Sequence, residues 1–302
     1  MTEQPVIEII NLSRRYSSKL ALDNISLEVP QGAVFGLVGE NGAGKTTIIK
    51  HVLGMLRAQS GTVRVFGRDP VADPVGVLSS LGYLSEEPDL PGWMTVRELL
   101  SYSKSFYSTW DDGYAKELQD DFGLNSSTLI KSLSKGQRAR AGLITALAFR
   151  PQLLLLDEPS SGLDPIVRRD ILGAVIRTIA DEGRTVLFSS HLLTEVETVS
   201  DRLAMVQQGR IVFSDTMESI KQTHFRAKLI LPVMLDSPPE LALALDWKGA
   251  GRDWTALCSG KISEVEAWAH AAKVKIVSIT SASLDEIFLA RVSPSISKVK
   301  RD

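Results

Sequence analysis

The most constraining feature of this sequence is the glycine-rich stretch at residues 39–47, which reads Gly-Glu-Asn-Gly-Ala-Gly-Lys-Thr-Thr. It matches the pattern GxxxxGK[ST], in which the backbone N–H groups of a loop surround phosphate. The apolar residues 33–38 before it predict a buried strand, and residues 48–56 after it have the apolar spacing of a helix. Strand, glycine loop and helix in this order predict an α/β fold with an anion site at the loop.

Individual residues of this loop have predictable roles. Gly42 and Gly44 permit backbone conformations and close approaches that a side chain would obstruct. Lys45 supplies a cation for the outer phosphates, and the Thr46 hydroxyl is suited to hold Mg²⁺. We expect every residue of the loop to contribute to nucleotide binding: Gly39, Glu40, Asn41, Gly42, Ala43, Gly44, Lys45, Thr46 and Thr47.

Two neighbouring carboxylates, Asp157 and Glu158, follow the wholly apolar residues 153–156. Such a run predicts a strand of a parallel sheet that is covered on both faces, and the carboxyl end of such a strand faces the ligand crevice. Asp157 could bind the Mg²⁺ shell, and Glu158 could take a proton from an attacking water. The alternative is an ordinary carboxylate pair at the start of a helix, which the phosphate loop nearby disfavours.

Composition limits the classes of protein that remain. The 302 residues carry a net charge of −2, which does not suggest a nucleic-acid partner, and 44% hydrophobic content supports a full globular core. Cys258 is the single cysteine, so an internal disulfide is impossible, which fits a reducing compartment. We expect no export signal at the start of the chain and no spanning segment, because no apolar run approaches the roughly 18–20 residues that a bilayer requires.

Sequence texture divides the chain into two parts. Residues 95–150 have a helical pattern that begins at a capping box formed by Thr95 and Glu98. We expect a first domain over residues 1–224, with these helices as a subdomain, and a small second domain over residues 225–302.

Other segments predict strands or a loose end. Residues 6–12 alternate apolar and polar side chains, which predicts an edge strand. Residues 203–206 and 210–213 predict a hairpin around Gln208-Gly209. The Ser- and Lys-rich tail, residues 293–302, is expected to be mobile.

Taken together, six motifs in chain order resemble the ATP-binding cassettes of ABC transporters, over roughly residues 5–215. They are the phosphate loop at 39–47, the loop at 82–86, the Leu-Ser-Lys-Gly-Gln signature at 133–137, the strand end at Asp157 and Glu158, the Ser-Gly-Leu-Asp loop at 161–164, and His191. The resemblance implies a mixed sheet core, an antiparallel β subdomain and an α-helical subdomain, here followed by a small α+β C-terminal domain.

The resemblance also implies roles for single residues. Tyr16 would stack on the adenine of ATP, Glu158 would be the general base, and His191 would steady the γ-phosphate and the water. Ser134 and Gly136 would contact the γ-phosphate of ATP held by an opposite subunit, which implies a head-to-tail dimer with a second copy or a paralogous cassette. Judged from the residues alone, Tyr16 could be a surface aromatic, and His191 and Ser134 could simply cap the helices that follow them.

Two positions depart from the family pattern. Glu86 stands where the family usually has Gln. Its carboxylate can still bind Mg²⁺ together with Thr46 and Asp157. Unlike the amide of Gln, however, it cannot donate a hydrogen bond. Lys135 replaces a glycine of the signature, and we expect its side chain to point to solvent rather than to the phosphates.

Three features are similar to the cassettes of drug, bacitracin and polysaccharide exporters: Glu86 with Glu87-Pro88, the Leu-Ser-Lys-Gly-Gln signature, and Ser-Leu-Asp-Glu-Ile-Phe at 283–288. Residues 106–111 also resemble the Ytr-type branch. This implies an ATPase that drives export through separate integral membrane permease subunits. It would lie in the cytoplasm, at the inner face of the cell membrane.

Two other functions fit the sequence less well. A translation or DNA-repair ATPase of the same family would usually carry tandem cassettes or an inserted coiled coil, and the sequence has neither. A non-enzymatic regulator is disfavoured by the intact Asp157, Glu158 and His191.

Overall fold

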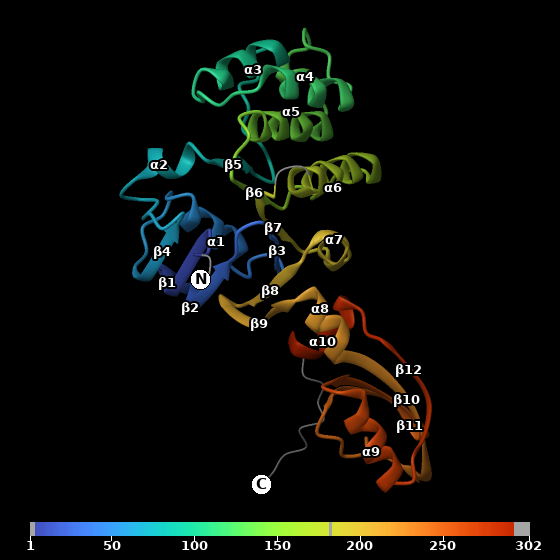
Figure 1. Ribbon diagram of the computed structural model, residues 1–302. Coiled ribbons are helices and arrows are strands. Elements are labelled where there is room, and N and C mark those ends of the chain that lie inside the picture. Colours follow the sequence, from blue (N-terminus) through green and yellow to red (C-terminus); the bar gives the residue numbers. More distant parts are fainter. Residues whose placement is uncertain (1–3, 181–182, 293–302) are drawn as a thin grey trace. The chain divides into compact units, whose positions relative to one another are not determined.

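The computed structural model describes residues 4–180 and 183–292 of the chain (Figure 1). The chain divides into two compact units, Met1–Ser214 and Asp215–Asp302. Helix α8 (Met217–Thr223) therefore belongs to the second unit, whereas the sequence analysis includes it in the first domain. The tail that is expected to be mobile, residues 293–302, lies outside the described residues.

A six-stranded sheet forms the centre of the first unit, with the order β5-β6-β7-β3-β8-β9. Its strands are β3 (Val34–Val38), β5 (Leu81–Leu84), β6 (Leu153–Asp157), β7 (Thr185–Ser190), β8 (Arg202–Gln207) and β9 (Arg210–Thr216). Strands β5, β6, β7, β3 and β8 pair in parallel. The predicted hairpin turn is confirmed, since Gln208 and Gly209, between β8 and β9, both have positive φ angles of 48° and 78°.

A second sheet of the first unit is antiparallel, with the order β2-β1-β4. Strand β1 (Ile7–Tyr16) lies between β2 (Lys19–Val29) and β4 (Ser60–Val65), so the prediction of an edge strand is wrong. Alternation of apolar and polar residues shows that one face is buried, but it does not show how many neighbours a strand has. The second neighbour, β4, comes from far along the chain.

The helical region contains three longer helices, α3 (Val96–Lys104), α4 (Asp112–Asp121) and α5 (Lys135–Leu147), which Figure 1 shows together. The predicted capping box of Thr95 and Glu98 is confirmed at the start of α3. Helix α5 contacts α3, α4, β5 and α6 (Pro165–Ala180), so it joins the helical region to the sheet. The first unit also contains three shorter helices: the 3-10 helix η1 (Ile130–Ser132) in the helical region, and α2 (Pro74–Leu78) and α7 (Leu193–Val199) outside it.

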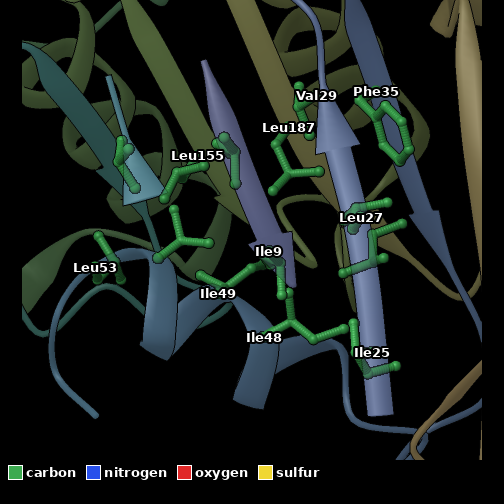
Figure 2. Close-up of a cluster of buried hydrophobic side chains, with 14 of the residues drawn as sticks. Ile9, Ile25, Leu27, Val29, Phe35, Ile48, Ile49, Leu53, Leu155 and Leu187 are labelled. Carbon is green, nitrogen blue, oxygen red and sulfur yellow. The ribbon is translucent and has the colours of Figure 1, made fainter. Parts of the chain in front are cut away.

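Helix α1 (Lys45–Val52) is buried between the two sheets of the first unit. Figure 2 shows its Ile48 and Ile49 among Ile9 and Ile25 of the antiparallel sheet and Leu187 of the six-stranded sheet. All five side chains are at most 1% exposed. Burial of each contributes about 1.5–3 kcal/mol, so the helix that begins at the phosphate loop is held firmly from both sides.

The second unit is an antiparallel sheet of order β11-β10-β12 with helices. Its elements are α8, β10 (His224–Leu235), β11 (Ala244–Ser259), α9 (Ile262–Ala271), β12 (Lys275–Ser281) and α10 (Leu284–Val292). The first half of strand β11 contains Gly249 and Gly251 at positive φ and lacks a regular apolar alternation. Burial raises the pKa of the Cys258 thiol to about 11, which makes it an unreactive core residue.

Among the described residues, none of the helices combines the length and the apolar character that crossing a membrane would require.

Candidate functional site

The register of the parallel sheet brings the ends of three strands together. Val38 at the end of β3 pairs with Ser190 at the end of β7, and Asp157 at the end of β6 pairs with Ser189. Whatever follows these strands must therefore share one edge of the sheet. The residues that follow are the phosphate loop, Glu158 and His191, which the sequence analysis assigned to one site.

The phosphate loop has the backbone that its glycines predict. Gly42 and Gly44 have φ angles of 81° and 119°, which strongly favour glycine. A Cβ added at Gly39 would lie 2.3 Å from the Val206 carbonyl oxygen, so a side chain cannot be accommodated there. Gly44 caps α1 with no side-chain hydrogen bond, which leaves N–H groups of the first turn for a ligand.

Lys45 lies under this loop with its ammonium group between acceptors. Its Nζ donates to the carbonyl oxygens of Gly39, at 2.6 Å, and Glu40, at 3.1 Å. The same Nζ lies 3.0 Å from Glu158 Oε1, and the two side chains are 5% and 8% exposed. The predicted phosphate cation and the predicted general base are therefore a buried ion pair in this structure.

Asp157 and Thr46 meet as the predicted metal ligands require. Thr46 Oγ1 donates to Asp157 Oδ1 at 3.1 Å, and Ser189 Oγ donates to the same oxygen at 2.7 Å. Burial raises the pKa of the Asp157 carboxyl, against the opposing effect of these two hydrogen bonds. Burial, with the charge of Asp157, also raises the pKa of the Tyr83 phenol in β5 to about 12.

Hydrogen bonds hold Glu158 in a strained backbone conformation. Its φ of 49° is unusual for a residue with a side chain. Its N–H donates to Ser189 Oγ at 2.9 Å, and its Oε2 lies 2.7 Å from Nδ1 of His191. The backbone N–H of His191 also donates to that oxygen, at 3.3 Å. Glu158 and His191 are therefore already paired.

Two predicted site residues, Tyr16 and Glu86, make no hydrogen bond or ion pair with Thr46, Asp157 or Glu158 in the described part of the chain. Tyr16, at the end of β1, is 42% exposed, and the Arg14 guanidinium lies 4.9 Å from the centre of its ring. Its hairpin reaches the phosphate loop, because Lys19 Nζ would lie 4.0 Å from a Cβ at Gly42. Glu86, in the loop after β5, is exposed and makes no hydrogen bond or ion pair with Thr46 or Asp157 among the described residues.

The signature residues lie at the start of α5. Ser134 forms a capping box with Gln137, in which Ser134 Oγ accepts from Gln137 N at 3.2 Å. A Cβ added to the buried Gly136 would lie 2.8 Å from Val167 Cγ2 of α6. Lys135 is half-buried, and its Nζ would lie 3.0 Å from a Cβ at Gly162. The Lys135 side chain thus lies over the loop at 161–164, not in open solvent.

Sequence reasoning missed two parts of this site. Ser189 bonds both Asp157 and Glu158, and Glu195 is a buried carboxylate on α7 that accepts from two serine hydroxyls. Two adjacent polar residues at the end of an otherwise apolar strand were the available signal for Ser189. Glu195 belongs to no motif of the sequence, and its serine partners come from segments that meet it only in the folded chain.

Comparisons with known proteins agree with this geometry. A family model described as "ABC transporter" matches residues 22–161. The chain is 31% identical to the daunorubicin/doxorubicin resistance ATP-binding protein DrrA of Streptomyces peucetius, over 96% of this chain and 94% of that protein. It is 30% identical to the bacitracin transport ATP-binding protein BcrA of Bacillus licheniformis, over 72% of each chain.

A solved structure described as the ATP binding subunit of an ABC transporter is also similar. It superposes with a TM-score of 0.66 at 27% identity, over 72% of this chain and 92% of the other.

Proposed function

Since this chain belongs to the family of ABC transporter ATP-binding proteins, we propose that it is the subunit that hydrolyses ATP to drive a membrane transporter. The observation that carries the proposal is the position of Glu158. It lies beside the phosphate loop, 3.0 Å from the Lys45 ammonium and 2.7 Å from the His191 ring. A carboxylate next to a phosphate site is placed to accept a proton from a water that attacks phosphorus.

In this proposal the phosphates of ATP bind the loop at residues 39–47 and the uncapped first turn of α1. Lys45 then exchanges its contact with Glu158 for the outer phosphates, which frees Glu158 to accept the proton from water. His191, joined to Glu158 by its ring and its backbone N–H, orients that carboxylate and the γ-phosphate. Tyr16, exposed at the end of β1, is available to stack on the adenine.

We assign Mg²⁺ to Thr46 and Asp157. The residues fit this ion, because a hydroxyl and a carboxylate oxygen converge there and hard oxygen ligands are what Mg²⁺ prefers. A bound Mg²⁺ would offset negative charge on the outer phosphates of ATP. Glu86 remains a proposed third ligand, which would have to approach from its exposed loop.

The partners follow from the positions of the signature residues. Ser134 is exposed at the start of α5, where backbone N–H groups and a hydroxyl can meet an anion. We infer that Ser134 and Gly136 contact ATP held by a second cassette, either a copy of this chain or a paralogue. Integral membrane permease subunits would complete the transporter, and no nucleic acid takes part.

Direction and location are inferred from the relatives. DrrA is named for drug resistance and BcrA for bacitracin transport. The resemblance of the signature and the Glu86 loop to those of exporters, noted from the sequence, supports the same direction. We therefore propose export, by a cassette at the cytoplasmic face of the membrane.

The test is the variant Glu158→Gln, which keeps the shape of the side chain but removes the base. We expect ATP hydrolysis by the protein, with its permease restored, to fall about 10²- to 10⁴-fold while ATP binding is retained. The measurements are phosphate release and ATP affinity. Normal turnover by this variant, or wild-type protein that neither binds nor hydrolyses ATP, would refute the proposal.

A further inference from the structure

We propose that Glu195, on α7, is a positioning residue that fixes the geometry of Glu158 and His191. This inference rests on the proposed function, since it concerns the same hydrolytic site. Glu195 is 4% exposed and touches neither the phosphate loop nor Asp157 through any hydrogen bond or ion pair in the described residues. Its importance would come from what it holds in place.

One oxygen of Glu195 joins the chain segments that carry the two hydrolytic residues. Ser160 Oγ donates to Glu195 Oε2 at 2.7 Å, and Ser190 Oγ donates to the same oxygen at 3.0 Å. Ser160 lies two residues after Glu158, and Ser190 immediately precedes His191. A single buried carboxylate oxygen thus connects the backbone on either side of the Glu158–His191 contact.

The connection to His191 is reinforced by the backbone. Ser190 Oγ also accepts a hydrogen bond from the Leu192 N–H at 2.9 Å, so this hydroxyl spans the chain on both sides of His191. With its backbone held there, His191 can direct both its N–H and its ring Nδ1 to Glu158 Oε2. Loss of Glu195 would release the Ser190 hydroxyl and with it this loop.

The other oxygen of Glu195 reaches a third segment. Arg168 Nε, in the first turn of α6, lies 3.2 Å from Glu195 Oε1. Helix α6 begins directly after the loop at residues 161–164. This ion pair attracts the start of α6 to α7, which also contacts the end of β7 through the Ser190 hydroxyl.

The expected consequence is kinetic. Misplacement of a catalytic group by about 1 Å can cost on the order of 10²-fold in rate, without loss of ground-state binding. Glu195 contacts the serines that flank the hydrolytic pair and not the phosphate loop. Its removal should therefore lower kcat and leave the KM for ATP nearly unchanged.

The experiment compares three single variants in the full-length protein, assayed with its permease: Glu195→Ala, Glu195→Gln and Glu197→Ala. We expect Glu195→Ala to lower kcat about 10- to 100-fold with KM changed less than about threefold. Glu195→Gln keeps an acceptor oxygen for both serines and should recover most of this loss. Glu197 lies on the same helix, and its side chain makes no hydrogen bond or ion pair among the described residues. It is the matched control, and Glu197→Ala should hydrolyse ATP at the wild-type rate.

A double variant, Ser160→Ala with Ser190→Ala, removes the two serine contacts of Glu195 but leaves the Glu195–Arg168 ion pair in place. It therefore tests the same contacts without removing the buried carboxylate. It should reproduce the kcat loss of Glu195→Ala, with urea unfolding used to show that both proteins are folded under assay conditions. The inference is overturned if Glu195→Ala retains its kcat, if KM rises as much as kcat falls, or if Glu195→Gln gives no recovery. Wild-type protein without Glu158-dependent hydrolysis would instead overturn the proposed function, and this inference with it.

Discussion

The two units of this protein treat buried polar groups in opposite ways. The first unit buries Lys45, Asp157, Glu158 and Glu195 at one edge of its central sheet. In the described part of the second unit, His224 is the one polar side chain in the buried class. The core of the second unit is instead apolar, with members such as Phe225, Leu229 and Cys258.

This difference separates residues kept for chemistry from residues kept for folding. Removing a charged group from water costs several kcal/mol, which ion pairs and hydrogen bonds offset only in good geometry. A chain selected for stability alone gains little from such groups. The four ionisable side chains buried at this edge of the sheet therefore mark the place where the protein acts, and the second unit shows what a core without this requirement looks like.

The largest predicted effect on stability comes from removing one partner of the buried Lys45–Glu158 pair, where the contrast between the two units is greatest. In nucleotide-free protein, Lys45→Met leaves the Glu158 carboxylate buried without its ammonium partner. We expect this to lower the free energy of unfolding by about 3–5 kcal/mol, as measured by urea denaturation.

The matched control is the exposed ion pair between Lys116 and Asp120, whose side chains are 63% and 61% exposed. Lys116→Met should cost less than about 1 kcal/mol, because water screens that pair. Equal losses in the two variants would show that burial does not distinguish the site.

A somewhat smaller effect is expected in the apolar core of the second unit. Leu229, on the central strand β10, is fully buried in the core of this unit, and Leu229→Ala should lower its stability by about 2–4 kcal/mol through lost burial and a cavity. Urea unfolding followed through Trp247 and Trp254 measures it. If ATP affinity fell in parallel, the two units would not be energetically separate, and the comparison would need revision.

The smallest effect on stability concerns His51, a buried histidine of α1 that is not among the residues proposed to hydrolyse ATP. Burial lowers the pKa of its imidazole, with Arg14 adding to the effect. Protonation therefore favours the unfolded chain: the stabilising contribution is present above the ordinary pKa near 6.5 and is lost as the pH falls below it. A difference of one pKa unit corresponds to about 1.4 kcal/mol.

His51→Gln should accordingly flatten the dependence of unfolding free energy on pH between about 5 and 7.5. Lys50→Gln, on the exposed face of the same helix, serves as the control and should keep the wild-type slope. An unchanged slope in His51→Gln would contradict the assignment of this pH dependence to His51.

The sequence predicts the phosphate site well because its motif is local. The strand, the loop glycines and the helix start at Lys45 lie within about twenty residues, and each depends on its own backbone chemistry. The parallel register then places Asp157 and His191 at the same edge, which follows from strand ends alone.

Where the sequence analysis fails, the missing information is long-range. The position of β1 between two strands depends on β4, which lies some fifty residues away. The pairing of Lys45 with Glu158 and the hydrogen bonds of Glu195 depend on side chains that meet only in the folded sheet. The first half of β11 carries no clear local signal, because its glycines interrupt the pattern that identifies a strand.

The close approach of Gly136 to Val167 affects how genetic data on this protein should be interpreted. A methyl group added at Gly136 would fall 2.8 Å from Val167 Cγ2, too close for any ordinary contact. Selection for glycine there can therefore reflect the spacing of α5 and α6 as much as a demand from ATP. An inactive allele at codon 136 diagnoses the nucleotide contact only when a partner change, such as Val167→Ala, fails to restore it.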